Sequence, residues 1–164
     1  MEAGDLLFGR RIRQNHALEH ATVTLLTRRL PNLRVSARSN SKGFVIFADL
    51  NLDAVRQAAD EGLGRLRAGE RELAIHPNCG TNLAVGTSVA MLGSLFALTA
   101  VRPRTRIASA LASSAAGILV ARPLGRVAQR HVTTLPDLSD VTITSVARRV
   151  RWGFAVVEVR TSVE

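Results

Sequence analysis

The chain has 164 residues, which suffices for one domain or for one small domain with a membrane anchor. Apolar residues make up 46% of it, and this excludes a wholly disordered chain. A single cysteine excludes an internal disulfide. The first residues are acidic and are followed by Arg10, Arg11 and Arg13 without an apolar h-region between, which is not the pattern of a secretory signal.

The net charge of +9 would suit nucleic acid if the basic residues formed one patch. In the second half of the chain, however, arginines lie mainly at the ends of apolar runs, at positions 102, 104, 106, 122, 126 and 130. That placement is typical of contacts with lipid headgroups. Aromatic residues make up only 4% of the chain, too few for a base-stacking platform. We therefore expect a lipid bilayer and no nucleic acid as partner; the sequence does not indicate an oligomeric state.

Periodicity predicts an α/β part at the start of the chain. A helix is expected over residues 5–30, with Ile12, His16, His20 and Val23 on one inward stripe, and Pro31 ends it. Two short strands follow, over 33–38 and 44–49, joined by a turn with Gly43.

A second helix is predicted over residues 52–67, with Asn51 as its N-cap and Gly69 closing it. A third strand is expected at 71–76. At the other end of the chain, residues 141–146 and 154–160 alternate like strands around a loop at 148–153, which predicts a C-terminal hairpin.

The middle of the chain carries two long uncharged runs. Residues 83–101 would form a helix of about 28 Å, the thickness of the hydrocarbon core of a bilayer. Residues 107–121 are shorter but have arginines at both ends that can snorkel. Small residues in both runs suit close helix packing: Gly86, Ala90, Gly93 and Ser94, then Ala108, Ala112, Ala116 and Gly117. We predict a transmembrane hairpin of about 82–101 and 106–122; the alternative is a buried hairpin inside a soluble domain.

The predicted fold class is therefore α+β. A small two-layer α/β unit (helix, β-hairpin, helix and strand plus the C-terminal hairpin) is expected from residues 1–76 and 132–164, with the transmembrane hairpin inserted at 77–131. Both parts of the unit would lie on one side of the cell membrane, by default the cytoplasm. The arginine-rich loop at 102–106 runs against the positive-inside tendency, so the orientation stays open.

The segment His16-Ala17-Leu18-Glu19-His20 predicts a metal-binding site. Residues three and four apart are neighbours on a helix face, so two imidazoles can bind one metal ion beside a carboxylate. A divalent ion lowers the pKa of its water, and a neighbouring glutamate can take the proton. We expect His16 and His20 as zinc ligands and Glu19 as the base. The alternative is a packing role for both histidines, with Glu19 paired to an arginine such as Arg13 or Arg28.

Further ligands are expected at His76-Pro77-Asn78-Cys79-Gly80. His76 and Cys79 both suit zinc, and with the two helix histidines they would give three or four ligands. Four protein ligands predict a structural site, whereas three leave a position for water. The alternative is a turn in which Cys79 packs as a small residue and Asn78 caps a helix. His131 is expected to be a helix-dipole partner or a headgroup contact.

The order His-x-x-Glu-His resembles the motif of the inverted, pitrilysin-like zinc peptidases and that of S-ribosylhomocysteine lyase. The resemblance implies that His16 and His20 are metal ligands and Glu19 the general base. In the peptidases the third ligand is a glutamate, which here would have to be Glu70 or Glu72. In the lyase it is a cysteine, which here would be Cys79.

A longer part of the chain is similar to a family of small bacterial membrane proteins defined only as a domain of unknown function. The similar stretches are residues 15–22, 76–82, 121–126 and 131–134. This resemblance implies a membrane location and no assigned activity. The sequence thus predicts a membrane-anchored, metal-dependent hydrolase of unspecified substrate. The alternative is a non-catalytic membrane protein, with a structural metal site or none, that acts through a partner.

Overall fold

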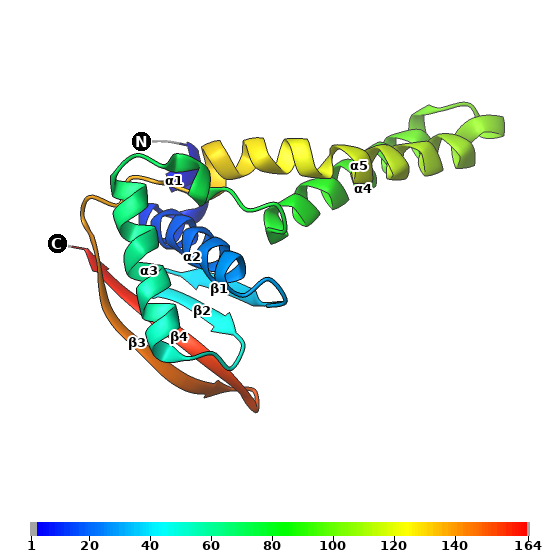
Figure 1. Cartoon of the computed structure of the whole chain (residues 1–164). Coiled ribbons are helices and arrows are strands. Elements are labelled where there is room, and N and C mark those ends of the chain that lie inside the picture. The colour runs from blue at the N-terminus through cyan, green and yellow to red at the C-terminus, as the bar shows by residue number, and fades with distance from the viewer. Residues whose placement is uncertain (1–2, 164) are drawn as a thin grey trace. The chain divides into compact units, whose positions relative to one another are not determined.

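A four-stranded antiparallel sheet with helices beside it is the main feature of this computed structural model, which describes residues 3–163 (Figure 1). Over these residues the fold is α+β, with five α-helices and strand order β1-β2-β4-β3. The helices are α1 (Ala3–Phe8), α2 (Arg10–Arg29), α3 (Leu52–Arg67), α4 (Gly80–Ala100) and α5 (Arg106–Ala128). The strands are β1 (Ser36–Asn40), β2 (Gly43–Phe47), β3 (Val141–Arg151) and β4 (Phe154–Val163).

The chain divides into two units, which are described separately. One, the α/β unit, consists of the chain up to His76 together with the chain from Arg130 on. The other, the helical hairpin, consists of Pro77–Gln129. Short helical turns complete the chain: 3-10 turns at Arg71–Ala74 (η1) and Pro103–Thr105 (η2), and a π-turn at Gln129–Thr133 (η3).

The first predicted helix is interrupted. Gly9 has a φ of 74°, in the left-handed region that favours glycine, and this separates α1 from α2. The end of α2 at Arg29, just before Pro31, agrees with the prediction. Helix α3 has the predicted bounds, and the side chain of Asn51 caps it by accepting a hydrogen bond from the Ala54 N–H at 3.1 Å.

The predicted third strand at 71–76 is wrong. Residues Arg71–Ala74 form the 3-10 turn η1, which buries Leu73 and Ala74 in the core. Two consecutive buried residues fit a helical turn, whereas a strand would send them to opposite faces of a sheet. The apolar run Leu73–Ile75 has three residues, too few for its periodicity to distinguish a strand from a helical turn.

Both predicted β-hairpins are present with tighter turns. In the first, the side chain of Asn40 accepts from the Lys42 N–H at 2.7 Å, which holds a two-residue turn. In the C-terminal hairpin the expected loop reduces to Trp152 and Gly153, with φ of 51° and 80°. Two consecutive positive φ values are the pattern of a type I′ turn, which matches the twist of the flanking strands.

The core of the α/β unit lies between the sheet and two helices. Helices α2 and α3 pack side by side on one face of the sheet (Figure 1). From the sheet, the core takes Phe44, Ile46, Val157 and Val159, and the helices contribute further alanine, leucine and valine side chains. Because strand residues alternate between faces, Val45 and Glu158 belong to the opposite face.

The helical hairpin is held by close approach of α4 and α5. A Cβ added at Gly117 would lie 2.6 Å from the Cβ of Ala90, so only glycine fits there. Midway along the hairpin, Ser94 donates to the Ala110 carbonyl at 3.1 Å and shares a hydrogen bond with Ser114 at 3.0 Å. The small residues expected on the first helix are at this contact, but on α5 the expected Ala108, Ala112 and Ala116 are exposed.

Gly43 provides a test of the sheet. It has a φ of 139°, and an added Cβ would overlap the carbonyl oxygen of Val159 on β4. We expect Gly43→Ala to lower the free energy of unfolding by about 2 kcal/mol or more, from backbone strain and this overlap. Urea unfolding in detergent, followed by circular dichroism, measures the change.

The matched control is Gly64→Ala in α3. This glycine is exposed, and an added Cβ would have no neighbour within 4 Å. The substitution should stabilise the protein by about 0.5–1 kcal/mol through helix propensity. Equal effects of the two substitutions would contradict the register described here.

Candidate metal centre

Helix α2 carries an unusual number of polar side chains into the interior. Gln14, Asn15, Glu19 and His20 are all buried, and His16 is half-buried. Buried polar groups are costly unless they are hydrogen-bonded, so the partners of these residues determine how α2 is oriented. Asn15, for example, donates to the Asn40 carbonyl and accepts from the Thr161 hydroxyl, both at 2.7 Å.

Both histidines of the motif are oriented by backbone carbonyls. His16 Nδ1 lies 2.9 Å from the Thr133 carbonyl oxygen, and His20 Nδ1 lies 2.7 Å from the Ala74 carbonyl oxygen. A carbonyl only accepts, so each Nδ1 is the protonated nitrogen. The two ring centroids are 4.3 Å apart, with a 62° angle between the planes.

Protonation of Nδ1 determines the state of the second ring nitrogen of each histidine, Nε2. In a neutral imidazole protonated at Nδ1, the lone pair is on Nε2, the atom that binds a metal ion. Metal-binding histidines in proteins almost always donate their other N–H to a carbonyl or carboxylate, which fixes the tautomer and the ring orientation. His16 and His20 both have this arrangement.

His76 is the third histidine in this neighbourhood. Its ring centroid lies 5.8 Å from that of His20. Partial burial lowers the pKa of His76, and the positive charge of His20 lowers it further. Both effects favour the neutral imidazole, the form that binds metal ions.

Glu19 is buried on the side of α2 that faces β1. Burial raises its pKa from 4.5 to about 7; the charge of His16 and hydrogen bonds from Ser39 partly oppose that rise. The alternative prediction paired Glu19 with Arg13 or Arg28, but neither arginine is among the groups that shift the pKa of Glu19. The carboxyl group is thus held by Ser39, three residues after His16 and directly before His20 in the helix.

Cys79 belongs to the helical hairpin, where it caps α4. Its sulfur accepts a hydrogen bond from the Thr81 N–H at 3.4 Å, so the cap residue is Cys79 and not Asn78, as the alternative interpretation expected. Cys79 is half-buried, and it lies three positions after His76 in the chain. His131, by contrast, is exposed.

The sequence analysis missed the residues that hold the Thr133 carbonyl in place. The fully buried Arg13 donates from Nη2 to the carbonyls of His131 and Thr134, at 3.3 and 3.4 Å. The Leu135 N–H donates in return to the Arg13 carbonyl at 3.0 Å. A buried arginine among backbone carbonyls has no sequence signature beyond its place on the inward side of the helix.

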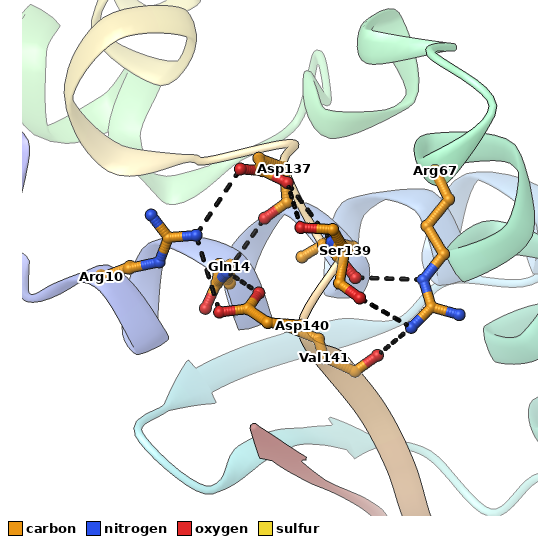
Figure 2. A network of polar contacts seen from close by, with 8 residues as sticks. Arg10, Gln14, Arg67, Asp137, Ser139, Asp140 and Val141 are labelled. Atoms are coloured by element: carbon orange, nitrogen blue, oxygen red, sulfur yellow. Dashed lines mark hydrogen bonds and ion pairs between the residues drawn. The ribbon is translucent and has the colours of Figure 1, made fainter. Parts of the chain in front are cut away.

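A second group of contacts holds the loop that precedes β3 (Figure 2). Gln14 donates to Asp140 at 2.7 Å and to the Asp137 carbonyl at 2.9 Å, and Arg10 lies 3.6 Å from both carboxylates. From α3, Arg67 donates to the carbonyls of Leu138 and Val141 at 3.1 and 2.7 Å. The loop is thereby fixed between the start of α2 and the end of α3.

These features define a class: an α+β unit with an HxxEH helix, interrupted by a hairpin whose two helices are long and apolar enough to cross a membrane. The chain belongs to the family described as a domain of unknown function, DUF6391, whose model matches residues 11–146. An uncharacterized protein of Picosynechococcus sp. is 36% identical over 146 residues, covering 82% of this chain and 70% of that protein. No solved structure matches the chain.

The expected membership in an uncharacterised bacterial family is confirmed by these matches. Neither description names an activity, a metal or a membrane. The likeness to inverted zinc peptidases and to the lyase therefore rests on the motif His16–His20 alone.

Stability of the metal-free protein should depend on the ionisation of Glu19. Its pKa in the folded chain, about 7, lies above 4.5, so folding favours the protonated carboxyl. This contribution is full below pH 4.5 and is lost as the pH rises through 7. Glu19→Gln cannot ionise, so it should exceed the wild type in unfolding free energy by about 2–3 kcal/mol at pH 8 and by little at pH 4.5.

Urea unfolding between pH 4.5 and 8, with a chelator present, measures this difference. Ser39→Ala is the matched variant: it removes a hydrogen bond that lowers the pKa of Glu19, so the loss of stability should extend to higher pH. Parallel pH profiles for the wild type and Glu19→Gln would show that Glu19 is solvated.

Proposed function

We propose that this chain is a membrane-anchored, zinc-dependent hydrolase in which His16, His20 and Cys79 hold the metal ion and Glu19 is the base. The observation that carries the proposal is the shared orientation of the two imidazoles. Each donates Nδ1–H to a backbone carbonyl, so that Nε2 is the ligand nitrogen.

The chemistry of the donor set fits a borderline-soft ion. His16, His20 and Cys79 offer two ring nitrogens and a sulfur, a group that could hold a metal ion. Only two residues separate Cys79 from His76, so the chain keeps their Cα atoms within about 11 Å of each other. This short tether supports Cys79 as the third ligand.

Three protein ligands are typical of catalytic zinc sites, because they leave a position at which the ion activates water. In that reaction Glu19 would take a proton from the water and return it to the leaving group. Its place beside His20 in the motif supports this role. The substrate class is left open.

A second candidate function is a closed structural site, and the position of His76 favours it. His76 lies next to His20, with centroids 5.8 Å apart, and it is a neutral imidazole by preference. As a fourth ligand it would exclude water and make the metal a folding element of a non-catalytic protein.

Membrane anchoring is supported by the helical hairpin. Its two apolar segments are 11% and 6% buried, whereas the core helix of a soluble domain would be mostly buried. Residues 73–136 include no acidic side chain. We propose that the two helices span the cell membrane and that the α/β unit lies in the cytoplasm.

Zinc content tests the metal site directly. The purified full-length protein should hold one equivalent of zinc, and the His16→Ala/His20→Ala double variant should hold none. Cys79→Ser should weaken binding at least tenfold, since an alcohol is a poor zinc ligand. The control is His131→Ala, at an exposed histidine outside the cluster. A zinc-free native protein, or an equal loss in the control, would contradict the proposal.

Cobalt substitution separates the catalytic from the structural site. With an open position, the visible spectrum of the cobalt protein should change when a small anion is added, and His76→Ala should leave metal affinity unchanged. If His76 is a ligand, His76→Ala weakens metal binding at least tenfold, and the visible spectrum of the native cobalt protein does not change when the anion is added. Glu19→Gln should retain zinc in either case.

The anchor is tested by membrane extraction. The native chain should resist alkaline extraction, because both apolar helices remain in the bilayer. Leu95→Arg and Phe96→Arg place a charge at exposed positions of α4, where it costs about 2.5–3.5 kcal/mol in a membrane, and should release a large fraction of the chain. Leu7→Arg, at an exposed leucine of α1, should not. Quantitative release of the native chain would exclude the anchor.

A further inference from the structure

The tip of the C-terminal hairpin exposes large apolar side chains. Val150, Trp152 and Phe154 are 75%, 78% and 70% exposed. Val150 pairs with Ala155 and Phe154 pairs with Arg151, so Val150 and Phe154 lie on opposite faces of the hairpin. Such side chains are costly in water unless a partner covers them.

Three arginines gather around one carboxylate on the strands behind this tip. Arg149, Arg151 and Arg160 each lie 3.4 Å from the carboxylate of Glu158, which is only 8% exposed. One carboxylate neutralises one guanidinium, so the cluster keeps a charge of +2. It lies on the face of the sheet turned away from α2 and α3, since Glu158 pairs with Val45.

Trp152 is itself held in position. Its ring is stacked on Phe47, with centroids 6.2 Å apart and planes 5° apart. The positive φ of Trp152 and Gly153 fixes the turn that carries it. The tip is therefore a preorganised combination of aromatic, aliphatic and cationic groups.

We propose that this hairpin tip is a second membrane contact, in which Val150, Trp152 and Phe154 enter the interface of a bilayer and the three arginines bind the phosphates of anionic lipids. Tryptophan is enriched at the membrane–water interface because one end of its ring system is apolar and the other is polar. Guanidinium groups behind the apolar tip would meet the headgroup phosphates.

A lipid surface fits the tip better than a single-stranded nucleic acid. A base-stacking platform presents successive aromatic side chains on one face, whereas here the apolar side chains of Val150 and Phe154 lie on opposite faces of the hairpin. Apolar side chains on both sides of a hairpin fit a medium that surrounds the tip, as the interfacial region of a bilayer does. The inference goes beyond the proposed function, since neither a metal site nor a membrane hairpin requires it.

Trp152 makes the test specific, because it is the only tryptophan of the chain. The full-length protein is reconstituted in phosphatidylcholine or in phosphatidylcholine with phosphatidylglycerol. With the anionic lipid we expect a blue-shifted emission, quenching by brominated lipid, and at least a threefold lower quenching constant for aqueous acrylamide. Equal acrylamide quenching in both membranes, without quenching by brominated lipid, would overturn the proposal.

Variants assign the effect to the tip. Arg149→Gln/Arg151→Gln should abolish the dependence on anionic lipid, and Arg34→Gln/Arg56→Gln, at exposed arginines elsewhere in the α/β unit, should leave it intact. Val150→Ser should reduce lipid quenching while leaving Glu158 and its arginines unchanged. Normal quenching in the two tip variants would overturn the proposal, as would protection of Trp152 by poly(U) in place of anionic lipid.

The outcome is independent of the anchor and of the zinc site. If alkaline extraction releases the chain, the proposed anchor fails, and the same quenching is measured on soluble protein mixed with the two kinds of vesicle. Zinc content does not enter the readout.

Discussion

The fold of the α/β unit depends on one constraint, the need of the buried polar face of α2 for hydrogen-bond partners. Gln14, Asn15, His16 and His20 find them in five different segments: the loop before β3, the strands β1 and β4, and the turns at 71–74 and 129–133. Each bond fixes the helix relative to another part of the unit. The orientation of the two imidazoles follows from the same bonds, so one set of interactions serves both stability and site geometry.

Those elements of the fold that carry local signals could be predicted from the sequence. Helix α3 has a capping asparagine at its start, and the first hairpin has a glycine where the backbone needs a positive φ. The 3-10 turn at 71–74 could not be predicted, because its two core residues satisfy either a strand or a turn until the packing is known. The break at Gly9 likewise depends on the conformation that one glycine adopts.

The candidate site, too, could be predicted from the sequence only in part. The spacing of His16 and His20 placed both on one face, because helix geometry is a local property. Their partners are backbone carbonyls of Ala74 and Thr133, and a carbonyl is present at every residue, so no pattern marks these two. Arg13 escaped notice for a related reason: its role is defined by carbonyls that lie far away in the sequence.

Because the α/β unit is discontinuous in sequence, its contacts become possible in a fixed order during synthesis. His20 meets a carbonyl 54 positions later in the chain, whereas His16 meets one 117 positions later, after the whole helical hairpin has been translated. Strand β4, which pairs with β2, emerges from the ribosome later still. An antiparallel hairpin returns the chain near its starting point, which spares much of the entropy that closing so long a loop would cost. The imidazole pair is thus aligned only after Thr133 has been translated, and a chain truncated within the helical hairpin has the motif without the carbonyl that orients His16.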